Sequence, residues 1–432
     1  MKKKLALLSV TILSTTMLSA MQFETLGYKS VAMGGAAVAS SSGSLATYNN
    51  PALLAKAKYD VEVSLGAGAS YEDFGAGASV KSLDDSGFLD TLDKVSNDTS
   101  NLTEADKQIL IKGKNIVIDM NGDAVSVNPQ GYVAAQVSGF GFGVFGSSEI
   151  VGTAKVDQNH NLLMIEDSSN PGNYLTINDD GTTLNSTGAV ADATYQTKSI
   201  EYALNNALTY MDVTGIVIAE VPVAYGHKIE LSGGNLLVGG ALKYMRGYTY
   251  TEQYKIDDSG SVSSGSGKKD QTSSTFGVDI GVAFEPAFSK DLTIAIVAKD
   301  LNSPEFDVVD GSKIKVKPMY RIGVAYNIFD SLEVAADYDL SANETFVENT
   351  KSQMLGGGVN WHPASWFALR AGLMQNMDAN DKAGLTYTAG LGFGAKWLQL
   401  DISGQYSSNS TTVEGQTVPE YAKVNVALIS RW

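Results

Sequence analysis

The sequence AKVNVALISRW, from Ala422 to Trp432, is the last stretch of the chain and alternates between apolar and polar residues. The apolar residues share one parity, which only Ser430 interrupts: Val424, Val426, Leu428 and Trp432. The polar residues have the other parity: Lys423, Asn425 and Arg431. Because successive side chains of a strand point to opposite faces, the stretch predicts a strand with one apolar and one mostly polar face. A terminal edge strand in a soluble sheet would show the same pattern, so the fold class depends on the rest of the chain.

The same alternation recurs along the second half of the chain. It is clear in residues 276–284, where Phe276, Val278 and Ile280 alternate with Gly277 and Asp279. Further strands are predicted at 61–71, 133–144, 220–229, 236–250, 292–298, 320–328, 332–340, 355–361, 367–373, 387–393 and 398–406. An open sheet of about fourteen strands would leave its edges exposed. The sequence therefore predicts an all-β fold, a closed antiparallel barrel.

The connections between these strands alternate in length. Residues 329–331 and 362–364 form tight turns, whereas 341–351, 374–385 and 407–420 are longer and polar. Short turns at one end, long loops at the other and strands of about nine to eleven residues are typical of transmembrane barrels of the bacterial outer membrane. The terminal strand also resembles the signal that the barrel-assembly machinery reads in such proteins. We therefore expect a barrel in contact with outer-membrane lipid.

The first residues have the pattern of an export signal. Lys2, Lys3 and Lys4 precede an apolar stretch that ends at Leu18, and Ala20 completes a small-residue cleavage site. Residues 1–20 are expected to be removed, which takes the formal net charge from −16 to −19. This acidity argues against nucleic acid as a partner. The absence of cysteine excludes disulfides, thiol nucleophiles and iron–sulfur sites.

Two insertions interrupt the strand series. Residues 84–128 contain a helical stretch that begins at a cap, Thr103-Glu104, and runs towards Lys114. Residues 157–215 are polar until a second predicted helix, whose apolar positions follow helical spacing. These positions are Ala193, Ile200, Ala203, Leu204, Ala207, Leu208 and Met211. The domain boundaries that follow are 21–57 for an N-terminal segment and 58–432 for the barrel with its two insertions.

The N-terminal segment contains GYKSVAMGGAAVA at residues 27–39 and YNNPALL at residues 48–54. The glycines permit close packing, and Asn49-Asn50-Pro51 predicts a turn or a helix start. This pattern resembles the "AMGGA…NPA" segment of the long-chain fatty-acid transporter (FadL-like) outer-membrane superfamily. The resemblance implies that 21–57 form a hatch inside a fourteen-stranded barrel, with Met33, Gly34, Gly35, Asn49, Asn50 and Pro51 as its motif.

A narrower resemblance is to the TraF-like branch, whose members are described as conjugal transfer proteins. It rests on the order of three pieces: EVPVAY at 220–225, LNSP at 301–304 and ADYDL at 336–340. The resemblance spans the chain from Gly27 to Trp432.

Residues that could support catalysis or metal binding are sparse. His160, His227 and His362 are far apart and have no metal-ligand spacing. Residues 119–123, DMNGD, miss the spacing and the closing Glu of a calcium loop. We expect no enzyme activity, no metal and no cofactor.

Charged residues on the polar parity of the strands are predicted to point into the lumen, since charges on the lipid face would cost a few kcal/mol each. They are Arg321, Arg370, Asp279, Glu333, Asp337, Asp339 and Asp401. One interpretation is a charge ladder that braces the lumen. The other is that Arg321 and Arg370 bind a carboxylate-headed ligand.

By resemblance, the function is passive uptake of a hydrophobic or amphipathic small molecule past a displaced hatch. The alternative is a structural barrel that anchors a surface, secretion or conjugation-related assembly through an envelope protein partner. A pocket beside the hatch would favour uptake, whereas a filled lumen and an exposed apolar patch on the insertions would favour the anchor. A polar-solute porin comes third, because a hatch would block it.

Overall fold

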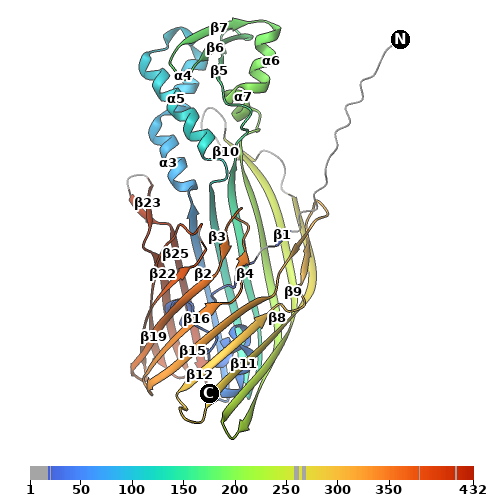
Figure 1. The fold of residues 1–432 in the computed structure, drawn as a ribbon, viewed down its shortest axis with the longest axis vertical. Coiled ribbons are helices and arrows are strands. Elements are labelled where there is room, and N and C mark those ends of the chain that lie inside the picture. The colour runs from blue at the N-terminus through green and yellow to red at the C-terminus, as the bar shows by residue number, and fades with distance from the viewer. Residues whose placement is uncertain (1–17, 20, 257–261, 265–268, 379, 414–415) are drawn as a thin grey trace, which may run out of the picture.

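The computed structural model describes residues 18–19, 21–256, 262–264, 269–378, 380–413 and 416–432. The predicted export signal falls almost entirely outside these residues. The described chain forms a tall barrel that encloses a short N-terminal segment and carries a mixed α/β cap at one end (Figure 1).

The barrel is a closed antiparallel sheet of fourteen strands, which confirms the predicted fold class. In order around the ring, the strands are β2 (Val61–Phe74), β3 (Ala124–Val137), β4 (Phe140–Lys155), β8 (Tyr210–Leu231), β9 (Gly234–Ile256), β11 (Lys269–Pro286), β12 (Leu292–Lys299), β15 (Met319–Phe329), β16 (Leu332–Asp339), β19 (Met354–Ala364), β20 (Phe367–Asn376), β21 (Thr386–Ala395), β22 (Leu398–Ser407) and β25 (Tyr421–Arg431). The ring closes where β25 pairs with β2, from Glu62 opposite Arg431 to Glu72 opposite Tyr421. The last strand therefore has two partners and leaves no edge.

The two ends of the barrel differ as the connection lengths predicted. At the end that holds Trp432, tight turns join β3 to β4, β8 to β9 and β15 to β16; we call it the turn end. The turn predicted at 362–364 lies at 365–366, because β19 continues to Ala364. The opposite end, the loop end, carries the long connections. Among these are short hairpins: β13 (Glu305–Asp307) with β14 (Lys313–Lys315), β17 (Asn343–Glu344) with β18 (Lys351–Ser352), and β23 (Ser410–Val413) with β24 (Gln416–Pro419).

The outer face of the barrel is apolar. In β25 the side chains of Val424, Val426 and Leu428 are exposed, while Lys423 and Asn425 are buried inside. Large aromatic side chains are exposed beside the tight turns and at the C-terminus: Phe288, Phe329, Trp366, Trp397 and Trp432. An outward apolar band flanked by aromatic residues is what a bilayer requires of a barrel. The protein is a barrel of the bacterial outer membrane.

Among the residues that the structure describes, none of the helices is long and apolar enough to cross a membrane.

Residues 21–57 lie inside the barrel, and we call this segment the hatch after the role that its sequence predicts. Its elements are short: α1 (Tyr28–Ala32), η1 (Gly43–Leu45), α2 (Ala46–Asn49) and η2 (Pro51–Lys56). Nearly every residue from 26 to 54 is buried. The core of the hatch is shared with the wall, since Met33, Val38 and Leu53 belong to one apolar cluster with Ile216 and Leu237 of the strands.

The two insertions fold together into one unit at the loop end, which we call the head (residues 75–123 and 156–209). The first supplies α3 (Ala76–Ser86), α4 (Phe88–Asn97), η3 (Thr99–Asn101) and α5 (Glu104–Asp119). The second supplies a sheet of β5 (Leu163–Glu166), β6 (Asn173–Ile177) and β7 (Thr183–Thr187), followed by α6 (Ala189–Lys198) and α7 (Ile200–Asn205). Phe88, Leu92 and Leu110 of the first insertion share a core with Leu163 and Ile200 of the second.

The predicted insertion boundaries shift in the structure. The helices begin at Ala76 rather than 84, β3 already starts at Ala124, and β8 starts at Tyr210. The second predicted helix is wrong in extent: Ser199 ends α6 and caps α7, Ala207 has a φ of 54°, and Met211 lies in β8. Where a strand extends beyond the bilayer at the loop end, its outward side chains no longer face lipid and need not be apolar. The sequence of that part of the strand therefore resembles the sequence of a loop.

Candidate functional site

The hatch motif rests against glycines of the barrel wall. A Cβ on Gly356 would lie 1.9 Å from the carbonyl oxygen of Gly34, and one on Gly281 would lie 1.8 Å from Oδ1 of Asn50. A Cβ on Gly239 would lie 2.4 Å from the backbone nitrogen of Ala52. Both halves of the motif therefore approach the backbone of the wall so closely that a side chain larger than that of glycine would not fit there.

Within the motif, the asparagines hold the hatch backbone. Asn50 accepts a hydrogen bond from the Ala52 N–H (3.1 Å) and thereby caps η2, and it donates one to the Val38 carbonyl (2.8 Å). Asn49 donates to the hydroxyl of Ser41 (2.8 Å). Pro51 occupies the first position of η2, where a missing N–H costs nothing.

Two aspartates of β16 connect the hatch to the wall. Asp337 accepts hydrogen bonds from the backbone N–H groups of Ala37 (2.7 Å) and Val38 (2.8 Å). Asp339 forms a bidentate pair with Arg321 of β15 at 2.5 and 3.0 Å. The same guanidinium lies 3.8 Å from the centre of the Phe23 ring of the hatch. All three charged side chains are buried.

The remaining predicted lumen charges also have partners. Arg370 pairs with Asp401, and its guanidinium faces the ring of Tyr28 in α1. Glu333 forms an ion pair with Lys29 of the hatch at 2.5 Å. Both arginines are thus neutralised by aspartates of the wall. This arrangement favours the bracing interpretation over ligand binding by Arg321 and Arg370.

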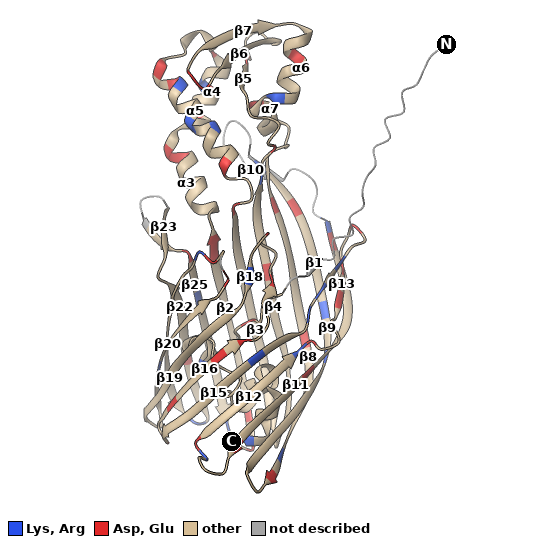
Figure 2. Cartoon of the chain, in the orientation of Figure 1, with Lys and Arg blue, Asp and Glu red and all other residues tan. Residues whose placement is uncertain are grey.

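Asp279 belongs to a larger cluster whose other members sequence reasoning missed. Lys243 of β9 lies 3.1 Å from Asp279, 2.8 Å from Asp300 and 3.3 Å from Glu220. Lys299, also buried, lies 3.3 Å from the centre of the Tyr48 ring in the hatch. The inward parity of Glu220, Lys243 and Lys299 in their strands was the signal that could have found them, whereas Asp300 follows the end of β12. Acidic and basic residues both occur along the strands of the barrel (Figure 2).

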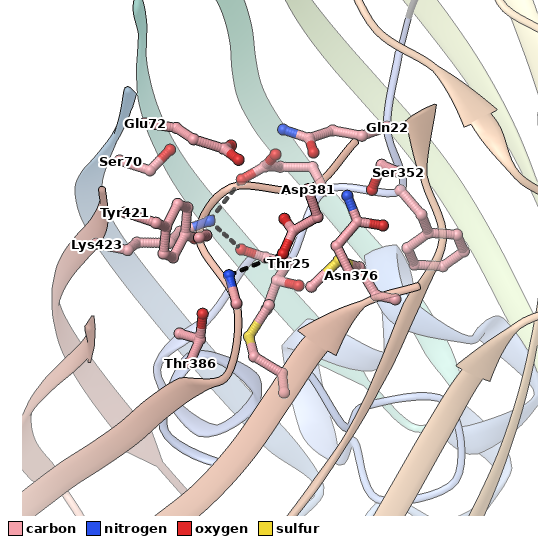
Figure 3. Close-up of a pocket in the computed structure, with 16 residues that line it drawn as sticks. Gln22, Thr25, Ser70, Glu72, Ser352, Asn376, Asp381, Thr386, Tyr421 and Lys423 are labelled. Carbon is pink, nitrogen blue, oxygen red and sulfur yellow. Dashed lines mark hydrogen bonds and ion pairs between the residues drawn. The ribbon is translucent and has the colours of Figure 1, made fainter. Parts of the chain in front are cut away.

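A cavity lies beside the hatch at the loop end of the lumen, with an empty volume of about 550 Å³ that includes space open to solvent (Figure 3). The hatch contributes residues 22–25, and the wall contributes side chains of β2, β19, β20, β21 and β25. Its lining combines Met354 and Met374 with the carboxylates of Glu24, Glu72 and Asp381. The one lysine in the lining, Lys423, pairs with Glu24 at 2.5 Å and donates to the carbonyl of Thr25 at 2.7 Å.

The barrel wall has a local break in its hydrogen bonding between β3 and β4. Residues 127–130 of β3 are not paired with β4 in the described structure, although the register continues on both sides of them. Pro129 lacks an N–H for the ladder. Side chains bridge the break: Asn128 accepts from the Ile150 N–H (3.0 Å), and Ser148 donates to the Pro129 carbonyl (2.6 Å).

An apolar groove lies outside this break. Its empty volume is about 1310 Å³, including open space, and its lining includes Leu65, Gly131, Val133, Val144 and Val426. On the inner side, both polar atoms of the Gln130 side chain are buried without a hydrogen-bond partner. The backbone hydrogen bonding of the wall is therefore interrupted at one place, with an apolar surface outside and a polar one inside.

Comparisons with known proteins agree with this architecture. Residues 47–339 match the family model described as "F plasmid transfer operon, TraF, protein". No curated protein matches the chain. The solved structure of a TodX monoaromatic hydrocarbon channel mutant (deltaS2) is similar at 11% identity with a TM-score of 0.51, over 95% of this chain and 100% of that chain. This likeness shows a shared barrel fold.

Two other solved structures align over nearly the whole chain. The Ralstonia pickettii toluene transporter TbuX has 14% identity and a TM-score of 0.49, over 95% of this chain and 99% of that chain. A Pseudomonas aeruginosa FadL homologue has 11% identity and a TM-score of 0.47, over 94% and 98%.

Proposed function

This chain belongs to the family described as "F plasmid transfer operon, TraF, protein", with a FadL-like barrel fold, and we propose that it takes up a small hydrophobic or amphipathic molecule across the outer membrane without an energy source. The observation that carries the proposal is the cavity between hatch residues 22–25 and the wall. Methionine side chains line part of it, and they adapt to ligands of irregular shape. A site of this kind sits where a molecule arriving from the loop end would first meet the hatch.

In the proposed route, the loop end faces the cell exterior, since long loops are extracellular in barrels of this class. The ligand enters the cavity, and movement of hatch residues 22–25 opens the way inward. The break between β3 and β4 supplies an exit for an apolar molecule into the bilayer, since its outer groove is lined almost entirely by apolar atoms. No step needs a catalytic residue, a metal or a cofactor.

Native mass spectrometry of the full chain, purified from its own membranes in mild detergent, tests the proposal. A stoichiometric apolar or amphipathic species should remain bound. Met374 lies in the cavity and is buried, whereas Met377 is exposed outside it. Met374→Trp should therefore displace the species, and the matched Met377→Trp should retain it. An empty protein, or equal retention in both variants, would contradict uptake through this cavity.

The head supports a second candidate, a barrel that anchors an envelope assembly. Two insertions far apart in sequence build one unit with its own core at the loop end. Large apolar side chains are exposed on it at Leu184 (61%) and Val190 (83%). Co-purification of a protein partner with the wild-type chain, abolished by Val190→Ser and unaffected by Met374→Trp, would favour the anchor.

A further inference from the structure

The sheet of the head has an open edge, strand β7. We propose that this edge is a docking site for an extended, positively charged segment of a partner protein, which adds to the sheet as a further strand. The inference rests on the second candidate function, the anchor, for which it names the docking surface and the chemistry of the partner.

The opposite edge of the sheet, at β5, is closed by the second insertion itself. The Leu162 N–H donates to the Lys198 carbonyl at 2.9 Å, and the Leu162 carbonyl accepts from the Ile200 N–H at 3.0 Å. The Ser199 hydroxyl donates to the Met164 carbonyl of β5 at 2.5 Å. Among the described residues, β7 by contrast pairs with β6 alone. Figure 1 shows β7 at the top of the head, far from the barrel.

The hydrogen bonds of β6 identify which backbone groups of β7 point outward. The Asn178 N–H donates to the Thr182 carbonyl on the β7 side at 2.9 Å, whereas the Asn173 carbonyl accepts from the Asp167 N–H on the β5 side at 2.9 Å. Because successive residues of a strand direct their backbone groups to opposite sides, the even-numbered residues of β6 bond to β7 and the odd-numbered ones to β5. In this register, the residues of β7 whose N–H and C=O groups point to the open edge are Thr183, Asn185 and Thr187.

β7 lacks the features that usually prevent an exposed edge from pairing, which are charged side chains, proline and bulges. Its sequence is TLNST, and its register with β6 is continuous. The side chains of Leu184 in the strand and of Val190 shortly after it are exposed. A strand added here would gain backbone hydrogen bonds from the edge and apolar contact from these side chains, as in other cases of β-strand addition.

The charge of the second insertion selects the partner. Residues 156–209 contain seven acidic residues and one lysine, Lys198. Asp180 lies in the turn before β7 and Asp192 in the first turn of α6 after it. They accept hydrogen bonds from Thr182 and Tyr174, but neither forms an ion pair within the described part of the head. A second copy of the head would bring like charge to this edge, whereas a cationic segment complements it.

Fluorescence anisotropy with the full chain in dodecyl maltoside, at neutral pH and low salt, tests the inference. The probes are two rhodamine-labelled peptides, Lys-Thr-Val-Thr-Val-Thr-Lys and its counterpart with glutamate at both ends. The cationic peptide should bind about tenfold more tightly or better, and salt should weaken it. Asn185→Pro removes an outward N–H but no bond to β6, and it should weaken the cationic peptide about tenfold. The matched Asn185→Thr keeps the N–H and should bind as the wild type does.

A second pair of variants tests the charge. Asp180→Asn, beside the edge, should weaken the cationic peptide about threefold. Asp119→Asn removes the same charge from an exposed position, the last residue of α5 before the chain enters β3, and should leave binding unchanged.

Equal binding of the two peptides, or unchanged binding in Asn185→Pro, overturns the inference. Dimers of the wild type that Asn185→Pro dissociates, measured by sedimentation, also overturn it, because the occupant would then be a second copy. A co-purifying partner that Asn185→Pro leaves bound overturns the edge as docking site while the anchor function stands. The anchor function fails separately if no protein co-purifies with the wild type.

Limited proteolysis at the wild-type rate shows that Asn185→Pro keeps the head folded. If cleavage is faster, Thr183→Pro replaces it with the same expectation, since proline is tolerated at the first position of an edge strand.

Discussion

The hatch and the head are both additions to the barrel, yet they are held in opposite ways. The hatch has no core of its own: its apolar residues pack into a cluster shared with the wall, and its backbone is bonded by Asp337, Thr388 and Gln405 of the strands. The head has a core made almost entirely from its own two insertions. The stability of the hatch therefore depends on charged and polar side chains of the barrel wall. The stability of the head depends mainly on its own core.

Removing the charge of Arg321 should have the largest effect on the hatch side of this comparison. Arg321→Met leaves Asp339 buried without a cation, and breaking a buried pair in this way costs about 3–5 kcal/mol. Urea unfolding followed by the mobility of unboiled protein on a denaturing gel measures the loss. The double variant Arg321→Met/Asp339→Leu should recover much of it. Equal losses in single and double variants would show that the ion pair is not what holds this region.

A cavity in the head core should act on the head alone. Phe88 is fully buried, and Gly113 of α5 packs so closely that a Cβ there would lie 2.2 Å from the Phe88 ring. Phe88→Ala should destabilise the head by about 3 kcal/mol and leave barrel unfolding unchanged. Limited proteolysis of folded protein should then cut within residues 75–123. A matching shift of the barrel midpoint would break the distinction between the two regions.

Two adjacent glycines of β9, Gly239 and Gly240, test how closely the hatch packs against the wall. Gly239→Ala places a methyl group against the backbone of Pro51 and Ala52, whereas at Gly240 the nearest atom to a new Cβ lies 3.6 Å away. Overpacking of this kind costs about 1–3 kcal/mol. Gly239→Ala should raise hydrogen exchange in residues 46–56, and Gly240→Ala should not. Similar exchange in the two variants would mean that the hatch is not seated on this glycine.

The helix cap of the head should give a smaller effect. The Thr103 hydroxyl accepts a hydrogen bond from the Asp106 N–H at 3.1 Å, and the Asp106 carboxylate accepts one from the Thr103 N–H at 2.9 Å. Together the two residues form a capping box at the start of α5. Thr103→Ala should cost about 1 kcal/mol of head stability. The readout is the rate of proteolysis of the head, with Thr197→Ala, at an exposed position of α6, as control. Faster cleavage of the control than of Thr103→Ala would contradict the role of the cap.

Acid should weaken the same cap. Hydrogen bonds from Lys94 and Thr103 lower the pKa of Asp106 from its ordinary value near 3.8 to about 2. Because the pKa is lower in the folded head, the stabilisation is present above about pH 4 and disappears as the pH falls towards 2. Pepsin cleavage of the head should therefore accelerate across this interval. Asp106→Asn should flatten the dependence, and a curve identical to the wild type would exclude this carboxylate as its origin.

The fold could be predicted from sequence wherever one parity faces lipid. Val424, Val426 and Leu428 show the reason: the bilayer imposes alternation that no loop has. The prediction failed above the membrane, where β8 extends from Tyr210 to Leu231 and its first residues are no longer selected by lipid. The same loss of pattern explains the shifted boundaries of the head.

The sequence predicted which charged residues point into the lumen, but it did not predict which of them form ion pairs with each other. Inward parity identifies Arg321 and Asp339 as lumen residues, yet their partnership depends on the register between β15 and β16. Lys243 escaped notice because its three carboxylates come from three other segments. The cavity could not be foreseen, since hatch residue Glu24 meets Lys423 across 399 positions of sequence.

The pairing of β25 with β2 also fixes the order in which the molecule can assemble. The ring cannot close before β25 pairs with β2, and the hatch precedes β2 in the chain. Its bonds reach far along the chain, with Gln405 donating to the carbonyl of Val31 across 374 positions. Contacts of such separation form late in folding. The bonds that seat the hatch therefore need the strands of the C-terminal half, and they form only once those strands are in place and β25 closes the wall onto β2.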